Sequence, residues 1–582
     1  MNAGPAVVWS RAEVPAATPA LIAAGIAPRT AELLARRGVA DADGAQAFLE
    51  PSLDQLHDPA GLHGLDGALD RLERARDAGE KVAIVGDYDV DGVSGTALLI
   101  AGLGSRGVDA TPFLPHRVRD GYGLQPRQVD RAREAGCSLI VTVDCGTTSG
   151  PAARHALALG LDLIVTDHHL PGEAGDALPE GVIEVNPRRD ACPYPFAELS
   201  GAGLAYKLVA AFAHRVGRPI DDERLLRIAC LGTIADLVPL RGENRVIAAL
   251  GLKALDATTS RGLRALFRVA RLAPPITAED IGFQLGPRLN APGRLDSAEP
   301  SLELLLTRDD SRAERLARDL DARNRERRTW ERRVTDEALE LFSRRSPLPP
   351  VLVGWSSGWH RGVVGVAAGR VARELHRPTL LLAEENDTAV GSGRSVEGVS
   401  LHGLVVPFAD ELERFGGHAQ AIGLTITRDR LEELQAFLEA TALDLEAQLA
   451  TRRLDYELET TPTELAGGLA AELARLEPFG AGNPRPLIRL RGPLRTVGEP
   501  RRFGNGHLEI QVAAVAEATA GDRIDRRDRV TMLGWGWAPR AERLHGPFEA
   551  LGHLERDRRR NRPVFRLVDC RPVEDPAPAT PA

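Results

Sequence analysis

The chain has 582 residues, which is more than one hydrophobic core usually supports, so its length predicts about four domains. With 43% apolar and 27% charged residues it is not a disordered chain, and no apolar run reaches the ~18 residues that a membrane helix needs. The formal charge of −9 argues weakly against a nucleic-acid partner, because such binding would need local basic surface. The five cysteines form no CxxC pair, which excludes a zinc finger or a disulfide scaffold and favours a cytoplasmic protein.

Residues 1–65 are rich in Ala and Leu and predict an N-terminal helical segment, whose role the sequence does not reveal. After it, helical patterns alternate with short Val/Ile/Leu runs, which predict strands at 81–86, 109–114, 138–143, 161–166 and 181–187. Alternation of this kind is typical of a parallel sheet covered by helices on both faces, an α/β fold. We expect this domain to span residues 66–305, with a mostly helical second half that ends in a loop, "GPRLNAPGR", at 286–294.

Three further regions follow. Residues 306–346 are dense in Arg, Asp and Glu, with apolar residues at near-helical spacing, and predict one long connecting helix. A basic helix that binds nucleic acid is the alternative, but acidic residues nearly balance the arginines. A second α/β domain is expected at 347–452, and short strands with Gly- and Pro-rich turns predict an OB-like β-barrel at 453–575, before a disordered tail at 576–582.

Acidic and imidazole side chains follow three of the expected strands directly. Asp87, Asp89 and Asp91 come after the strand at 81–86, Asp144 after that at 138–143, and the sequence "DHH" at 167–169 after that at 161–166. Ligands collect at the carboxyl ends of parallel strands, so these side chains are expected in one crevice. A lone DxD is usually a turn or a helix cap, and a lone HH is usually a surface pair, but together at one sheet edge they favour metal binding.

The ligand types narrow the choice of metal. Carboxylates dominate, imidazole contributes one or two positions and no thiolate is offered, which suits Mn²⁺ or Mg²⁺ better than structural zinc. An acidic site with enough oxygens for two ions can clamp a phosphate and activate water. The residues therefore predict hydrolysis of a phosphate ester.

Four ordered motifs carry a more specific resemblance: "DYDVDG" at 87–92, "VTVDCG" at 141–146, "VTDHH" at 165–169 and "IADLVPL" at 234–240. They resemble the motifs of the DHH phosphoesterase superfamily and, within it, the RecJ family of bacterial single-strand-specific 5′ to 3′ DNA exonucleases. Further stretches support this resemblance, among them "GSGRSVEG" at 391–398, "FGGHAQAIG" at 415–423 and "PFGAGNPRP" at 478–486. The resemblance covers about residues 65–575.

The resemblance implies roles for the residues at the strand ends. Asp89 and Asp91 would bind separate metal ions, Asp144 would bridge both ions, and His168 and Asp236 would complete the second site. His169 would be directed towards substrate or an exchangeable metal position, and Asp87 would orient a ligand from outside the metal shell. The catalytic group expected on this basis is Asp87, Asp144 and His169.

A phosphate pocket is expected in the second α/β domain. His360 precedes a run of small residues that predicts a helix start, where free N–H groups bind anions, although these glycines can equally serve tight packing. By resemblance, Ser392 and Arg394, helped by Arg117, would hold a terminal 5′ phosphate, while Arg288 and Arg294 would contact the strand near the cut. The remaining pocket residues implied by the resemblance are Gly416, Gly417 and His418.

The implied function is a metal-dependent exonuclease that degrades single-stranded DNA from its 5′ end in DNA repair and recombination. The barrel would capture the strand, with Arg501, Arg502, Phe503, Trp535, Trp537 and the basic run at 555–563 as candidate contacts. Family resemblance adds a single-strand-binding protein and a RecQ-type helicase as partners, no membrane, and a monomeric state. Two alternatives stay open: a related enzyme for short oligonucleotides, cyclic dinucleotides or pyrophosphate, and a catalytically silent replication scaffold.

Overall fold

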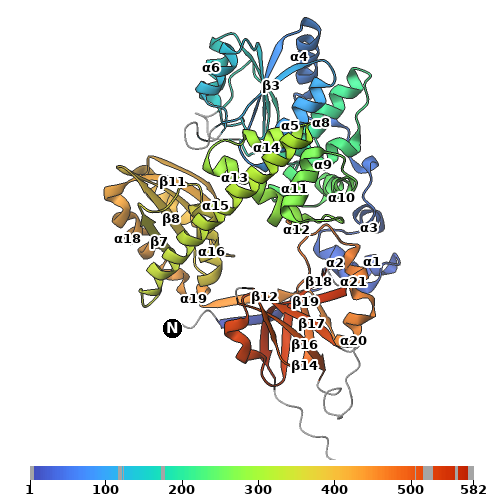
Figure 1. The fold of residues 1–582 in the computed structure, drawn as a ribbon, viewed down its shortest axis with the longest axis vertical. Helices are drawn as coiled ribbons and strands as arrows, with labels where there is room; N and C mark the ends of the chain where they lie inside the picture. Colours follow the sequence, from blue (N-terminus) through green and yellow to red (C-terminus); the bar gives the residue numbers. More distant parts are fainter. Residues whose placement is uncertain are drawn as a thin grey trace, which may run out of the picture. The chain divides into compact units, whose positions relative to one another are not determined.

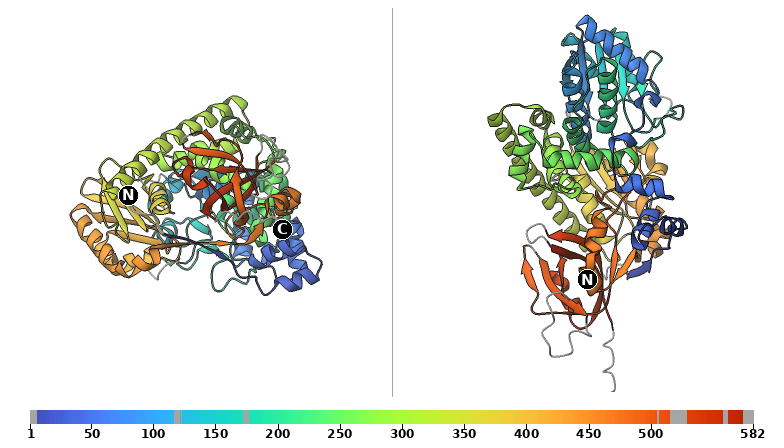
Figure 2. Two further views of the ribbon diagram at one scale, coloured as in Figure 1. Left: turned by 90° about the horizontal axis from the view of Figure 1, so that it is seen from below. Right: turned by 90° about the vertical axis from the view of Figure 1, so that its right-hand side faces the viewer.

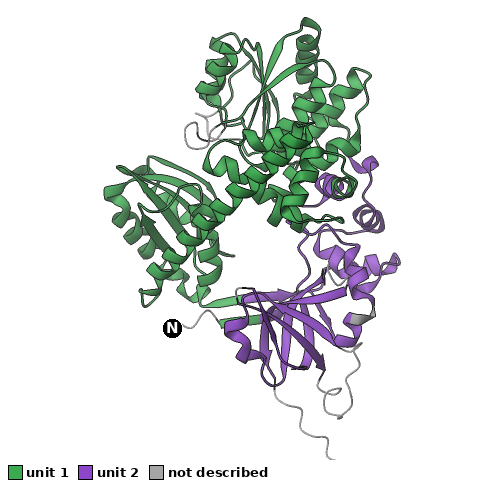
Figure 3. Cartoon of the chain, viewed as in Figure 1, with its two compact units in different colours: residues 1–8, 57–238, 250–452 green, residues 9–56, 239–249, 453–582 purple. Residues whose placement is uncertain are grey.

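The computed structural model describes residues 6–115, 121, 123–171, 177–504, 506–514, 529–557 and 562–573. The chain divides into two compact units, unit 1 (residues 1–8, 57–238 and 250–452) and unit 2 (residues 9–56, 239–249 and 453–582) (Figure 3). Each unit thus combines stretches that are distant in the sequence. In the part of the chain that the structure describes, none of the helices has both the length and the apolar composition that crossing a bilayer requires.

The first sheet of unit 1 has five parallel strands in the order β3-β2-β4-β5-β6 (Figure 1). The strands are β2 (Lys81–Gly86), β3 (Asp109–Phe113), β4 (Leu139–Val143), β5 (Asp162–Thr166) and β6 (Ile183–Val185). Helices α6 (Pro126–Glu134) and α7 (Gly150–Ala158) pack on one face, and α4 (Leu65–Ala78), α5 (Val90–Gly104) and α8 (Gly201–Arg215) lie on the other. Because both faces are covered, the inner strands β2, β4 and β5 are buried nearly throughout and apolar without alternation, as expected for a parallel sheet.

A helical region follows the sheet. Its helices are α9 (Asp222–Ala235), α10 (Gly242–Asp256), α11 (Arg261–Ala270), α12 (Ala278–Asp280), the π-helix η4 (Ile281–Leu285), α13 (Gly286–Leu295) and α14 (Glu299–Leu306). The expectation of a loop at 286–294 is wrong, since these residues form α13. Pro287 lies in the first turn, where a missing N–H removes no bond, and the hydrogen bond lost at Pro292 is offset by burial of one side of the helix.

The long connecting helix is confirmed as α15 (Asp310–Ser343). Its apolar stripe, which includes Leu316, Leu320 and Val334, is buried. Several of its arginines form ion pairs one turn away on the same helix, such as Arg323 with Asp319 at 3.0 Å and Arg333 with Glu337 at 2.8 Å. This internal charge balance agrees with a spacer rather than a basic helix that binds nucleic acid.

The second sheet of unit 1 has the order β10-β11-β9-β8-β7, with only β7 and β8 parallel. Its strands are β7 (Leu352–Ser356), β8 (Thr379–Glu385), β9 (Thr388–Arg394), β10 (Arg414–His418) and β11 (Ala421–Thr427). One face packs against α15 and α16 (Val364–Leu375), and the other against α17 (Leu401–Val405) and α18 (Leu431–Thr441). A short helix, α19 (Glu446–Leu449), precedes β12 (Thr451–Tyr456), which pairs with β1 (Ala6–Arg11).

Unit 2 contains a seven-stranded sheet in the order β13-β14-β18-β19-β17-β16-β15, and β14 also pairs with β16. This extra pairing closes five strands into a ring, so the expected OB-like barrel is confirmed; Figure 2 shows the curled sheet in orange and red from two further sides. Its strands are β13 (Leu458–Thr460), β14 (Ile488–Thr496), β15 (Arg501–Phe503), β16 (His507–Ala514), β17 (Val530–Gly534), β18 (Phe548–Asp557) and β19 (Arg562–Pro572). The short helices α20 (Pro462–Glu464) and α21 (Ala470–Ala474) precede β14.

The N-terminal segment shares its hydrophobic core with this barrel. Helices α1 (Thr18–Ala23), α2 (Pro28–Arg36) and α3 (Ala42–Leu49) contribute Leu21, Leu34 and Phe48 to the cluster that also contains Leu490 and Phe565. A hydrogen bond also joins the two segments, since the Trp9 indole N–H donates to the Asp569 carboxylate at 2.8 Å. Residues 9–56 are therefore part of the C-terminal fold, a role that their sequence does not reveal.

We predict that Leu21→Ala lowers the free energy of unfolding of unit 2 by about 2–5 kcal/mol, because the lost methyl groups leave a cavity in this shared core. The neighbouring Ile22 on the same helix is 41% exposed, and Ile22→Ala serves as the matched control, with an expected change below about 1 kcal/mol. Calorimetric unfolding of both variants measures the difference. Equal, small losses would mean that α1 contributes little to the barrel's stability.

Candidate metal centre

The first acidic cluster lies at the carboxyl end of β2, where the chain turns into α5. Asp87 follows the strand directly and is almost fully buried. Asp89 is the N-cap of α5, and its carboxylate accepts hydrogen bonds from the backbone N–H groups of Asp91 and Gly92, at 2.9 and 3.1 Å. The DxDxD spacing therefore places one carboxylate on the strand end, one on the cap and one in the first helical turn.

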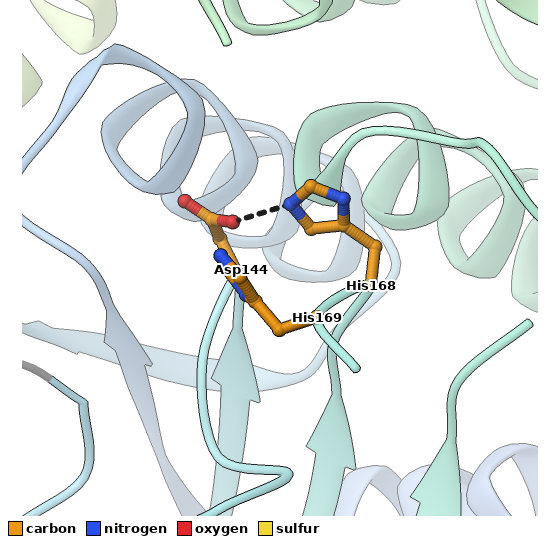
Figure 4. A group of neighbouring side chains, drawn as sticks. All are labelled: Asp144, His168 and His169. Atoms are coloured by element: carbon orange, nitrogen blue, oxygen red, sulfur yellow. Dashed lines mark hydrogen bonds and ion pairs between the residues drawn. The ribbon is translucent and has the colours of Figure 1, made fainter. Parts of the chain in front are cut away.

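The neighbouring strands β4 and β5 deliver Asp144, His168 and His169 to the same edge (Figure 4). His168 Nε2 lies 3.0 Å from Asp144 Oδ1, the interaction drawn as a dashed line. Asp144 has φ 61°, a left-handed conformation that is uncommon for a residue with a side chain. Such backbone strain is frequent at functional sites, because the surrounding structure must impose it.

Asp91 and Asp236 complete the group from the helical side. The Asp91 carboxylate accepts from the backbone N–H groups of Gly201 and Ala202 at the start of α8, at 2.7 and 2.9 Å. Asp236 is the C-cap of α9. His168 Nε2 lies 3.7 Å from Asp91 Oδ2 and 3.6 Å from Asp236 Oδ2, so one imidazole faces carboxylates from three elements.

The ligand atoms form three overlapping groups, each with all members within 4.8 Å of one another. The groups are Asp87, Asp89 and Asp144; Asp91, His168 and Asp236; and Asp144, His168 and His169. Asp144 and His168 each belong to two of them, and their contact at 3.0 Å connects the three groups into one centre. Asp87 lies as close to Asp89 and Asp144 as a direct ligand would, although the family resemblance implied only an orienting role for it.

Burial makes this cluster electrostatically costly without cations. Burial, followed by the charge of Asp89, raises the pKa of Asp91 to about 7. Burial, followed by the charges of Asp91 and Asp89, raises the pKa of Asp236 to about 8 and that of Asp144 well above its usual value. Burial also lowers the pKa of His168 to about 3, which keeps its imidazole neutral and able to bind a metal. Raised pKa values mean that some of these carboxylates would bind protons at neutral pH. The donor set therefore fits divalent cations, which would take the place of those protons.

Asp167, which was expected at the strand end but given no role of its own, orients His169. Its buried carboxylate accepts from the backbone N–H groups of Thr147 and His168, at 2.9 and 2.7 Å, and lies 2.7 Å from His169 Nδ1. Burial opposes ionisation of Asp167, but the hydrogen bond and charge of His169 lower its pKa to about 2. In turn, burial lowers the pKa of His169, but the hydrogen bond and charge of Asp167 together with the charges of Asp236 and Asp87 raise it to about 9. The only sequence feature that points to this role is the position of Asp167 directly before the two histidines.

Two glycines allow the helices to approach the carboxylates. A Cβ atom at Gly201 would lie 2.6 Å from Asp144 Cβ, and one at Gly232 of α9 would collide with Asp91 Oδ1. Neither glycine was singled out in the sequence, because nothing in the local pattern shows which helix face meets the strand ends. Their lack of a side chain brings the N-terminus of α8 into hydrogen-bonding range of Asp91.

The second sheet brings together most residues expected in a phosphate pocket. Ser392 on β9 pairs in register with Gly423 of β11, which pairs with Gly416 of β10. The Arg394 guanidinium donates to Ser392 Oγ at 3.2 Å. Gly365, in the first turn of α16, lies against Ser392, since a Cβ there would be 2.6 Å from the hydroxyl.

The other residues expected in the phosphate pocket differ in their exposure and in the elements on which they lie. Gly417 and His418 are exposed on β10, and His360 Nδ1 accepts from the Gly362 N–H at 3.0 Å before α16 begins. The carbonyl of Arg294, near the end of α13, lies beside Gly362. This end of α13 is therefore next to the segment that carries His360. Arg288 is buried and forms an ion pair with Asp321 of α15 at 3.0 Å. Arg117 lies outside the described residues.

The barrel candidates separate into an exposed and a buried group. Trp535 is 51% exposed and contacts Phe503 and His507 edge-on, with ring centroids 5.5 and 4.7 Å apart. Arg501 lies over the Phe503 ring and forms an ion pair with Glu509, and Arg502 is exposed. Trp537 is part of the hydrophobic core, so the expectation that it contacts a ligand is wrong. Residues 558–561 of the basic run lie outside the described residues.

Comparison with known proteins agrees with this geometry. The chain matches the DHH family N-terminal domain over residues 81–233, the DHHA1 domain over 348–444 and the RecJ OB domain over 456–568. It is 37% identical to the single-stranded-DNA-specific exonuclease RecJ of Salmonella typhimurium, over 86% of this chain and 89% of that protein. It is 36% identical to RecJ of Bacillus subtilis, again over 86% of this chain but over only 63% of that longer protein.

A solved structure extends the likeness to the whole fold. The crystal structure of RecJ in complex with Mn²⁺ from Thermus thermophilus superimposes with a TM-score of 0.80 at 31% identity, covering 98% of this chain and 80% of that one. The order of the domains, the strand-end acids and these similarities have one explanation: the chain belongs to the RecJ family.

Proposed function

We propose that the protein is a metal-dependent exonuclease that degrades single-stranded DNA from the 5′ end, in DNA repair and recombination. The observation that carries the proposal is the convergence of five carboxylates and two imidazoles at one sheet edge, in a chain that belongs to the RecJ family. The related enzyme for small substrates is less well supported, because it has no need of a long connecting helix and a barrel. A silent scaffold is less well supported because every expected metal ligand is present.

Two ions, Mn²⁺ or Mg²⁺, fit the donor set of the metal centre. Asp89, Asp144 and Asp87 would hold one ion, and Asp91, His168 and Asp236 would hold the other. Asp144, which lies 3.0 Å from His168, would be shared between them. When bound, such ions neutralise the charge of a phosphodiester and lower the pKa of the attacking water. His169, whose ring is oriented by Asp167, would exchange a proton with substrate or water. The N–H groups of Gly201 and Ala202 keep Asp91 in its orientation.

The pocket around Ser392 and Arg394 would set the polarity of cleavage. Hydroxyl, guanidinium and glycine N–H groups suit a terminal phosphate, and Gly416 and Gly417 leave room for it. Arg294 and His360 would contact the strand between this pocket and the metals. The help of Arg117 in holding the 5′ phosphate stays a prediction, because this residue lies outside the described residues. The strand contact of Arg288 also stays a prediction, because Arg288 pairs with Asp321.

The barrel would capture the strand through the exposed cluster of Trp535, Phe503 and His507, flanked by Arg501 and Arg502. Single-stranded DNA is the proposed ligand. A single-strand-binding protein, a RecQ-type helicase, the monomeric state and the cytoplasmic location stay predictions from family resemblance and composition. The six-part division of the chain at residues 65, 305, 346, 452 and 575 also stays a proposal.

We predict that Asp144→Ala reduces hydrolysis of single-stranded DNA to background, because one carboxylate serves both ions. His169→Ala should keep Mn²⁺ binding nearly intact and slow turnover by about a hundredfold or more, the usual contribution of a positioned acid or base. Calorimetric Mn²⁺ titration and single-turnover kinetics measure the two effects. Asp130→Ala, which removes an exposed carboxylate of the same domain, is the control, and unchanged turnover in Asp144→Ala would refute the two-metal assignment.

Arg394→Ala should weaken the use of 5′-phosphorylated DNA about tenfold more than that of 5′-hydroxyl DNA, because it removes a charge-assisted contact to a dianionic end. Comparing kcat/KM on the two substrates measures this selectivity. The exposed Arg373 on α16 provides the control variant Arg373→Ala, which should leave the ratio unchanged. Equal losses on both substrates would assign Arg394 to the strand in general or to the fold.

Trp535→Ala should weaken binding of long single strands by about 5- to 150-fold, since a stacked base contributes about 1–3 kcal/mol. Trp535→Phe should recover most of this affinity. The double variant Arg501→Ala/Arg502→Ala should instead make the salt dependence shallower. Affinity across a salt series separates these outcomes, and point variants are needed because truncation near residue 455 would uncover the apolar faces of α1 to α3. Unchanged affinities and slopes would leave the barrel without a role in capture.

A further inference from the structure

The segment that follows β6 carries a fully buried asparagine, Asn186. Its side-chain amide donates to Thr147 Oγ1 and to the His169 carbonyl, both at 2.9 Å. Its side-chain oxygen accepts from the Arg188 N–H at 2.9 Å, the contact of an Asx turn. Both amide N–H groups and the amide oxygen are therefore engaged, as expected for a polar side chain that is shielded from water.

The register of the first sheet explains the placement of Asn186. Thr166 of β5 pairs with Val185 of β6, and beyond the strand the Asp167 N–H donates to the Val185 carbonyl at 3.2 Å. Asn186 is the next residue along the chain, so it lies beside the residues that follow β5. Because parallel strands present their carboxyl ends at one edge of the sheet, Asn186 reaches the edge that holds the metal centre.

Asn186 closes a ring of hydrogen bonds around His169. The Asp167 carboxylate lies 3.2 Å from the His169 backbone nitrogen and 2.7 Å from its Nδ1. The same carboxylate accepts from the Thr147 N–H at 2.9 Å, and the Thr147 hydroxyl accepts from Asn186. Asn186 also donates to the His169 carbonyl, which completes the ring. The ring joins the segments that follow β4, β5 and β6, and such connected buried bonds make a site rigid.

This ring is important for His169 because packing alone does not fix its side chain, which is 39% exposed. Asp167 holds the ring nitrogen, whereas Asn186 holds the backbone from which the ring extends. We propose that Asn186 is a positioning residue for His169 and keeps its imidazole directed at the reacting phosphate. The proposal rests on the function proposed above, in which His169 exchanges a proton with substrate or water.

Asn186→Ala should slow turnover without weakening binding. The change removes both amide donors, so the His169 backbone loses the contact at its carbonyl. A displacement of a reacting group by about 1 Å costs about a hundredfold in rate, so we expect kcat to fall about ten- to a hundredfold. KM for single-stranded DNA and the Mn²⁺ affinity should stay within about threefold of wild type, because the groups that bind strand and metal are unchanged.

Gln128→Ala is the matched control in the same domain. Gln128 is also fully buried, and its side-chain oxygen also accepts a backbone hydrogen bond, from the Gln125 N–H at 3.0 Å, but it lies on α6. Both variants remove a buried amide and should lose similar thermal stability, which calorimetric unfolding measures. Gln128→Ala should keep kcat within about twofold of wild type, so a lost kcat in Asn186→Ala alone does not come from stability.

The imidazole itself provides a readout that needs no turnover. In the metal-free full chain with ¹³C at the histidine Cε1 positions, the NMR signal that is absent from His169→Ala identifies His169. This signal should shift or broaden in Asn186→Ala, because the ring loses its fixed orientation, and it should keep its wild-type position in Gln128→Ala. An unchanged His169 signal in Asn186→Ala would overturn the proposal.

Single-turnover kinetics in a His169→Ala background test whether Asn186 acts through this side chain. There, Asn186→Ala should cause no further loss of rate, because no imidazole remains to be positioned. Losses that add would assign Asn186 to the metals or to the fold, against the proposal.

A second pair of variants tests the ring if Asn186→Ala does not fold. Thr147→Val removes the hydroxyl that accepts from Asn186 and should lower kcat, whereas Thr147→Ser keeps the hydroxyl and should retain it. Equal kcat values for the two Thr147 variants would then contradict the proposal. A wild-type protein that shows the His169 signal but does not hydrolyse single-stranded DNA with Mn²⁺ would refute the proposed function instead, and the NMR comparison would still decide the role of Asn186.

Discussion

Mutual repulsion among buried carboxylates is the constraint on which unit 1 depends. Asp87, Asp91 and Asp144 are almost entirely removed from water, and each lies near further acids. Hydrogen bonds from the start of α8 stabilise the charged form of Asp91, yet burial and neighbouring acids still raise the pKa of Asp91 and of Asp144. Divalent ions are the groups that balance such a cluster at neutral pH. The sheet and the glycine contacts hold the cluster together, and they impose the strained backbone of Asp144.

The sequence predicted the features that depend on short-range patterns. Apolar runs identified the parallel strands, charge and spacing identified α15, and acids directly after strands identified most of the metal centre. The family motifs added Asp236, whose helix end gives no signal of its own. The expected loop at 286–294 failed because packing overrides local preference. Two prolines and two glycines in α13 indicate a loop, but burial against α15 and α14 favours the helix.

Other features could not be predicted from the sequence, because they depend on the direction in which a side chain points or on residues that are distant in the chain. Trp535 and Trp537 are two residues apart in one turn, and the sequence does not tell which ring enters the core. Asp167 resembles its acidic neighbours in sequence, yet it orients a histidine instead of joining a metal group. The partner of the N-terminal helices lies more than 400 residues away, a separation that no local pattern records.

The shared core of unit 2 has a consequence for how the chain folds during synthesis. Helices α1 to α3 leave the ribosome well before the strands that cover Leu21, Leu34 and Phe48. At about 5–20 residues per second, this apolar surface stays uncovered for roughly half a minute or longer. These helices are therefore among the last parts of unit 2 to become buried, and until then their apolar surface is open to aggregation.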